Sequence, residues 1–200
     1  CNNLKDITGV TVAAGGVFKY DPASKTLTMR DVTVSAEEYK SAIRNNGIEG
    51  LKIEVAGTNS LKMKDPGLDC FTSTELKGNG SLTIASDRAA VFVNSTLTIS
   101  DITLEAIGKW GIVGEDGNQN ETLIIKNATV TAKGTNVAIG DLKTVTLEGC
   151  GIVAPEGVEW KAEKKAVVDA DGNIAKEVKI EPAAAVKYEL YIAGTQVTDA

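Results

Sequence analysis

The chain repeats one eleven-residue pattern four times, and this repetition constrains the fold more than any other feature. The copies are TLTMRDVTVSA from Thr26, TLTISDITLEA from Thr96, TLIIKNATVTA from Thr122 and TVTLEGCGIVA from Thr144. In each copy two apolar pairs alternate with polar residues at period two, which is typical of β-strands. Between the pairs stands Asp, Asn or Gly, residues that tolerate the backbone of a tight bend. Each copy therefore predicts two short strands joined by a bend.

Two further units complete the series. The segment VAGTNSLKM (55–63) matches LKGNGSLTI (76–84), with Gly57 aligned on Gly78 and Ser60 on Ser81. The six units start near residues 26, 50, 74, 96, 122 and 144, so the later steps are 22, 26 and 22 residues. A third, looser strand follows the two short ones, at Leu68/Cys70, Val91/Val93, Ile112, Val137/Ile139 and Val158/Trp160.

Three short strands in a unit of about 22 residues predict a right-handed parallel β-helix of about six coils with β-hairpin ends. Inward Leu, Ile and Val side chains would stack on their counterparts one coil away, and several coils together can bury an apolar face that one coil cannot. Aromatic residues make up only 4% of the chain, which suits an aliphatic core. The alternative is a β-sandwich, which also uses short alternating strands but normally carries stronger hairpin signals at its turns.

A stack of coils needs covered ends, since an open sheet edge invites further pairing. At the front, apolar residues alternate through residues 7–20 around the small residues 13–16, which predicts a hairpin that turns at 13–16. Residues 36–43 have helical spacing at Tyr39, Ala42 and Ile43, which indicates either one short helix or an extended coil corner.

At the back, residues 169–173 (DADGN) have the chemistry of a hairpin turn. They also resemble the start of a calcium loop, but Ile174 and Ile180 stand where such a loop needs glycine and glutamate. We therefore expect a turn. Residues 181–185 (EPAAA) read as a linker, and residues 188–200 begin a new strand.

Several segments resemble large bacterial surface proteins with β-helix repeats: FKYDPASKTLTMRDVTV (18–34), NSL (59–61), GSL (80–82) and YELYIAGTQVT (188–198). That family comprises cell-adhesion and carbohydrate-binding proteins within the broad pectate-lyase-like superfold. The resemblance covers most of the chain, and its motifs are structural rather than catalytic. It implies an exported protein, at a bacterial cell surface or secreted, with neighbouring repeat domains in a longer chain. Residues 1–187 would form the β-helix unit, and residues 188–200 the first strand of a following repeat or a tail.

Charge and composition exclude several classes of function. The net charge is −6 and no basic run occurs, so nucleic acid and anionic membrane surfaces are poor partners. No apolar run approaches the roughly 18 residues of a transmembrane segment. The chain has no histidine, and its only arginines, Arg30, Arg44 and Arg88, fall on different coils. Histidine is the commonest general base, so we expect no enzyme. We also expect no metal and no cofactor.

The three cysteines, Cys1, Cys70 and Cys150, are too few and too far apart for a disulfide framework or a metal site. Cys150 aligns with the inward position of Val32, and Cys70 lies on an alternating third strand, so both are predicted to be packed core thiols. Cys1 is either a lipid-acceptor cysteine or an ordinary residue of a chain that begins inside a repeat.

The coil that begins at Thr96 is four residues longer than its neighbours, and the excess lies in GEDGNQNE (114–121), shortly after Trp110. Insertions in a repeat array often carry the recognition surface. An aromatic ring beside amides and carboxylates is a usual sugar platform. The candidate ligand-binding residues are Trp110, Asp116, Asn118, Asn120 and, at a related place two coils later, Trp160.

The function predicted from these features is a non-catalytic, adhesin-like module that binds an extracellular glycan or a surface protein through the flank of the coil. The alternative is a structural spacer with no ligand, in which Trp110 merely covers a coil corner. A polysaccharide lyase or hydrolase is the least favoured reading, because the acids and bases of such sites have no matching motif in the chain.

Overall fold

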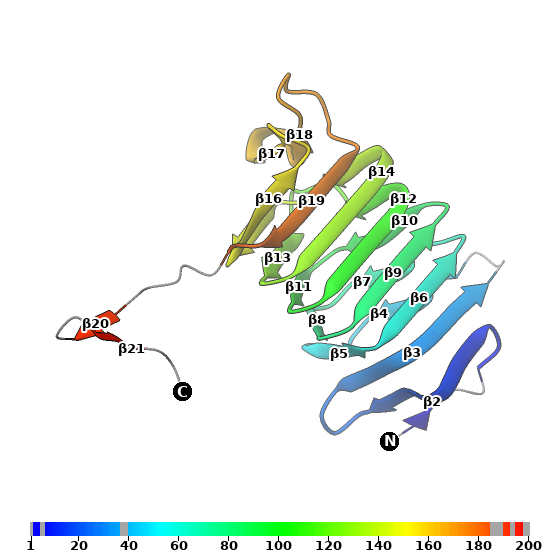
Figure 1. Cartoon of the computed structure of the whole chain (residues 1–200). Coiled ribbons are helices and arrows are strands. Elements are labelled where there is room, and N and C mark those ends of the chain that lie inside the picture. The colour runs from blue at the N-terminus through cyan, green and yellow to red at the C-terminus, as the bar shows by residue number, and fades with distance from the viewer. Residues whose placement is uncertain (1, 5–6, 37–39, 185–189, 193–194, 198–200) are drawn as a thin grey trace.

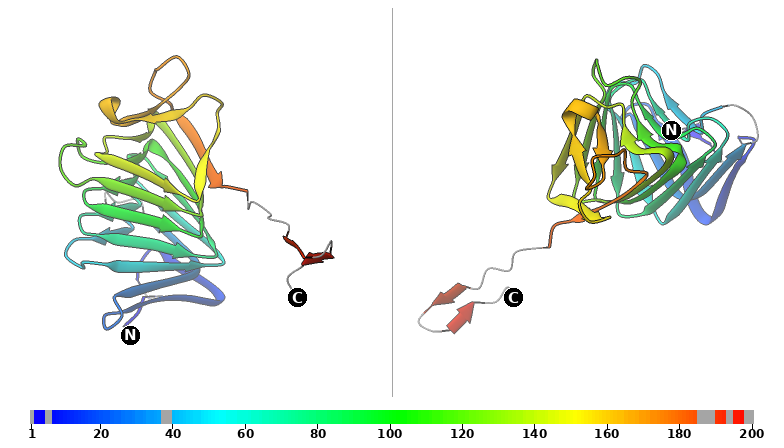
Figure 2. Two further views of the ribbon diagram at one scale, coloured as in Figure 1. Left: turned by 90° about the vertical axis from the view of Figure 1, so that its left-hand side faces the viewer. Right: turned by 90° about the horizontal axis from the view of Figure 1, so that it is seen from above.

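A computed structural model describes residues 2–4, 7–36, 40–184, 190–192 and 195–197, and it confirms the parallel β-helix (Figure 1). The alternative, a β-sandwich, is excluded because successive coils pair in parallel. Three sheets run along the stack, which Figure 2 shows from the side and from above. No helix in the described ranges is long and apolar enough to cross a membrane.

We name the three sheets A, B and C in the order in which each coil visits them. Sheet A contains the first half of β3 (Thr26–Ala36), β5 (Leu51–Ala56), β8 (Thr74–Gly78), β11 (Thr96–Ser100), β13 (Thr122–Lys126) and β15 (Thr144–Glu148). Sheet B contains the second half of β3, β6 (Thr58–Met63), β9 (Ser81–Ser86) and the first halves of β12 (Thr103–Val113) and β14 (Thr129–Gly140). Sheet C contains β4 (Ile43–Asn45), β7 (Leu68–Cys70), β10 (Ala89–Val93) and the second halves of β12 and β14.

The bends between sheets A and B fall where the sequence predicted them. The backbone has a positive φ there, as short polar residues and glycine allow. The residues are Asp31 (55°), Gly57 (62°), Asp101 (58°), Asn127 (44°) and Gly149 (63°). Side chains also link neighbouring bends: the Asp31 carboxylate accepts a hydrogen bond from the Thr58 N–H at 2.9 Å.

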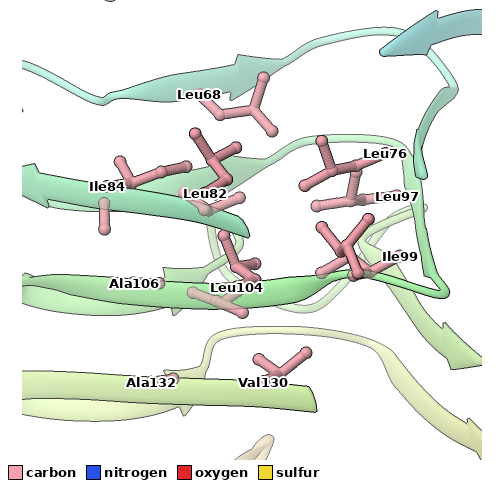
Figure 3. Close-up of a cluster of buried hydrophobic side chains, with 14 of the residues drawn as sticks. Leu68, Leu76, Leu82, Ile84, Leu97, Ile99, Leu104, Ala106, Val130 and Ala132 are labelled. Atoms are coloured by element: carbon pink, nitrogen blue, oxygen red, sulfur yellow. The ribbon is translucent and has the colours of Figure 1, made fainter. Parts of the chain in front are cut away.

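The core is the predicted aliphatic column. Leu82, Leu104 and Val130 stack one above the other in sheet B and are almost fully buried (Figure 3). Each such side chain contributes about 1.5–3 kcal/mol when it is fully buried. Cys70 belongs to this core, as predicted, and burial raises the pKa of its thiol to about 12.

The register of the first two coils differs from the sequence alignment by two residues. The alignment placed Val34 on Leu104, whereas in the structure Val34 pairs with Leu61, Leu61 with Ile84 and Ile84 with Ala106. A shift of two residues leaves every side chain on the same face of its strand, because strands have a period of two. The alternation of apolar residues therefore could not distinguish the two registers.

The helix has about five turns rather than the predicted six. The sixth unit begins as predicted with β15, but β16 (Cys150–Ala154) then leaves the stack because β19 (Glu177–Pro182) lies between β14 and β16, antiparallel to both. The prediction that Cys150 is a packed core thiol is therefore only partly correct. It is only half-buried, and its thiol donates a hydrogen bond to the Ile125 carbonyl at 3.3 Å.

A hairpin covers the front end, but its turn is not where the sequence indicated. Strand β2 (Val10–Asp21) runs antiparallel to β3, and the chain turns between Asp21 and Thr26. Residues 13–16 form a bulge within β2 instead of a turn. Strand β1 (Asn2–Asn3) pairs with β2. Residues 40–42 are not helical, which favours the extended corner; residues 37–39 and Cys1 lie outside the described residues.

At the back, β17 (Glu159–Lys161), a short 3-10 helix η1 (Ala162–Lys164) and β18 (Ala166–Val168) form an antiparallel cap. The predicted turn at residues 169–173 is confirmed, since the Asp169 carboxylate accepts hydrogen bonds from the N–H groups of Asp171 and Asn173 at 3.0 and 2.8 Å.

The predicted linker at 181–185 is partly wrong, because β19 extends to Pro182. Within residues 188–200, β20 (Leu190–Ile192) and β21 (Thr195–Val197) pair antiparallel, so this segment holds two short strands rather than one. The remaining residues of the segment lie outside the described ones. Its assignment to a following repeat stays a prediction.

Candidate functional site

The outer side of sheet C carries a cleft of about 370 Å³. Its residues come from successive coils, because parallel pairing places Arg44 beside Asp69, Asp69 beside Phe92 and Phe92 beside Val113. The cleft is lined by Arg44, Asp65, Pro66, Asp69, Phe71, Arg88, Ala89, Phe92, Trp110, Val113, Gly114, Glu115 and Asp141. Its volume lies within the range of small-molecule sites, roughly 300–1,000 Å³.

Three aromatic side chains give the cleft its apolar surface. The rings of Phe71 and Phe92 are tilted against each other, with centroids 6.0 Å apart, and Phe71 is 36% exposed. Trp110 is half-buried, and the ammonium of Lys109 lies 4.9 Å from the centroid of its ring. Trp110 is thus the one sequence-predicted candidate that lines the cleft directly.

Two ion pairs lie beside these rings. Arg44 Nε contacts Asp69 Oδ2 at 2.9 Å, and Arg88 Nη1 contacts Asp65 Oδ1 at 3.1 Å. The guanidinium of Arg44 also lies 4.9 Å from the centroid of the Phe71 ring. Arg44 and Arg88 belong to different coils, as the sequence indicated, but the stacking of the coils brings both into one cleft.

Asp69 is the buried member of the group. Its side chain is only 5% exposed, and Oδ2 accepts a second hydrogen bond from the Ser41 hydroxyl at 3.1 Å. Oδ1 is buried, and none of the described residues donates a hydrogen bond to it. Burial raises the pKa of the Asp69 carboxyl, against the opposing effects of the Ser41 hydrogen bond and the Arg44 charge. The carboxylate that anchors Arg44 therefore keeps one buried oxygen unsatisfied behind the surface of the cleft.

Two further carboxylates, Glu115 and Asp141, complete the lining. Glu115 Oε2 accepts a hydrogen bond from the side-chain amide of Asn94 at 3.3 Å. Burial raises the pKa of the Asp141 carboxyl, and the nearby charge of Lys165 opposes the rise. These acids add negative charge to the end of the cleft nearest the long loop.

The loop 114–121 contributes only Gly114 and Glu115 to the lining. Lys165 Nζ donates to the backbone carbonyl of Asp116 at 3.0 Å and to the side-chain oxygen of Asn118. Asn118 N–H donates to the Asp116 carboxylate at 2.8 Å, and hydrogen bonds from Asn118 lower the pKa of that carboxyl. Asp116 and Asn118 therefore hold the loop together beside the cleft.

Asn120 and Trp160, the remaining candidates, are not among the residues that line the cleft. Asn120 is exposed on the loop. Trp160 lies on β17, where it pairs with Val167 of β18 in an antiparallel hairpin and packs partly against the core. The alignment of residues 158–160 with the third strand of other coils was therefore wrong, and the two tryptophans do not share the cleft.

Most of the cleft was missed from the sequence, although a signal existed. Asp69 and Phe92 stand between inward pairs of the third strand, Leu68/Cys70 and Val91/Val93, so alternation placed both on the outer face. Of the two, the aromatic Phe92 was the usable signal, because an outward charged residue is ordinary on a solvated face.

Within the described residues, no group of three His, Cys, Asp or Glu side chains is placed to hold a metal ion. No family model matches the chain, and no curated protein or solved structure matches it either.

Proposed function

We propose that the chain is a non-catalytic attachment module that binds a glycan in the cleft of sheet C. The observation that carries the proposal is the grouping of Phe71, Phe92 and Trp110 with two Arg–Asp pairs in one cleft. Aromatic faces pack against the C–H faces of sugar rings, and a few convergent polar groups fix orientation. Arg–Asp pairs offer hydroxyl groups both donors and acceptors.

The sequence resemblance to bacterial surface proteins supports an extracellular role, as an adhesin-like unit at a cell surface or in a secreted protein. The ligand would then be an extracellular glycan.

The test is binding of the purified chain to a glycan array, followed by calorimetry on the glycans that bind. Trp110→Ala and Phe92→Ala should each weaken binding at least tenfold, since each removes part of the platform. Ile107→Ala is the matched control, because Ile107 is 36% exposed on β12 and does not line the cleft. Equal effects of Trp110→Ala and Ile107→Ala would contradict the proposal.

A structural spacer is the second candidate, favoured by the uninterrupted column of buried side chains through the stack. Absence of binding to any glycan would support it. Cleavage of pectin-like polysaccharides, with or without calcium, would instead replace the non-catalytic proposal with a lyase or hydrolase that uses the arginines and carboxylates of the cleft.

A further inference from the structure

We infer that the cleft selects uncharged sugars and rejects acidic ones, although two arginines line it. The inference rests on the proposed glycan binding and adds the class of sugar. Two arginines in a cleft normally indicate a site for carboxylate or phosphate groups. In this cleft their partners and the overall charge indicate the opposite.

Neither arginine offers an uncompensated charge. Arg44 is held by Asp69 and by the ring of Phe71, and Asp69 is itself buried, so exchange of this partner for a ligand carboxylate would leave Asp69 buried without its cation. Arg88 is held by Asp65 at 3.1 Å. An acidic sugar would have to compete with an aspartate that is already in place.

The charges that line the cleft sum to a negative value. Two arginines stand against four carboxylates, those of Asp65, Asp69, Glu115 and Asp141. Two lysines lie close by: Lys109 lies over the Trp110 ring, and Lys165 is bound to the loop that contains Asp116. Neither of these lysines lines the cleft. A ligand carboxylate would therefore meet a net negative charge in the cleft.

An uncharged sugar matches the polar groups that remain. An arginine has five N–H donors, so each paired guanidinium keeps donors for a ligand oxygen. The more exposed carboxylates of the lining, Asp65 and Glu115, have further lone pairs, and a sugar hydroxyl can donate to them. A ligand carboxylate is only an acceptor and cannot donate to these groups. The pairs therefore suit hydroxyl groups, which donate and accept at once.

The experiment compares oligogalacturonate with its methyl ester, which has the same backbone without the charge, alongside uncharged and acidic oligosaccharides on an array. The uncharged member of each pair should bind at least tenfold more tightly in calorimetry. Asp65→Asn should reduce this preference several-fold, because it releases Arg88 and removes one negative charge. Glu148→Gln should leave the preference unchanged, since Glu148 pairs with Lys126 on sheet A, outside the cleft.

Three outcomes are separable. Preference for uncharged sugars that Asp65→Asn reduces supports the inference. Tighter binding of acidic sugars, abolished by Trp110→Ala, overturns the inference but leaves glycan binding intact. Absence of binding to every glycan overturns the proposed function, and the inference fails with it.

Discussion

Replacement of Gly57 by alanine should destabilise the bend between sheets A and B by about 1.5–3.5 kcal/mol, the sum of a backbone cost and a lost hydrogen bond. Gly57 has φ 62°, and a left-handed backbone costs an L-residue roughly 1–2 kcal/mol. A Cβ at this position would also lie 2.1 Å from Asp31 Oδ1, the atom that accepts the Thr58 N–H. Displacement of that carboxylate should cost about 0.5–1.5 kcal/mol for the lost hydrogen bond.

Gly50→Ala provides the matched control. Gly50 also has a positive φ, 71°, but a Cβ there would meet no atom within 4 Å. It should therefore show only the backbone cost, about 1–2 kcal/mol. Urea unfolding monitored by circular dichroism gives both free-energy changes, provided the slope of the transition is unchanged.

A double-mutant cycle identifies the clash. In an Asp31→Gly background the carboxylate is absent, so Gly57→Ala should cost no more than Gly50→Ala does. If Gly57→Ala and Gly50→Ala destabilise the wild-type chain equally, the contact between neighbouring bends contributes nothing and the reasoning is wrong.

Four further outcomes are expected. Leu104→Ala should cost about 2–5 kcal/mol in urea unfolding, since Leu104 is fully buried in the stack. The raised pKa of Asp69 means that the folded state holds this proton more tightly than the unfolded state, so the contribution of Asp69 to stability should fall as pH rises from its unfolded pKa through its folded one. Asp69→Asn should remove this fall, which unfolding curves between pH 3 and pH 7, compared with wild type, would measure. Iodoacetamide should label Cys150 faster than the buried Cys70 in the folded chain, as read by peptide mass spectrometry. Lys165→Met should accelerate amide exchange in the loop that it contacts while changing glycan affinity less than twofold.

The sequence predicted the repeating part of the fold because the same local pattern recurs in every coil. Leu97, Leu123 and Val145 occupy one row, as their alignment indicated. The ends were predicted less well, because they depend on long-range pairing that has no periodic signal. The insertion of β19 between β14 and β16 is the main example, and it explains both the missing sixth coil and the partial exposure of Cys150.

The cleft was predicted only through Trp110. Sequence reasoning followed the long loop, whose polar residues suggested a ligand, but Lys165 engages Asp116 and Asn118, which lie outside the lining of the cleft. The stacking of sheet C brings together the residues that line the cleft, including Phe71 and Phe92. Because these residues are far apart along the chain, the sequence did not indicate that they share one site.

Residues that line the cleft are spaced at regular intervals along the axis of the β-helix. Arg44, Asp69, Phe92 and Val113 lie on successive strands of one parallel sheet, so their backbones follow one another at the fixed interstrand spacing of about 4.8 Å. A ligand that follows this row would meet groups whose separation cannot adjust to it, and little backbone entropy would be lost on contact. A substitution on one strand changes the side chain that a ligand meets there and leaves the positions on the other strands unchanged.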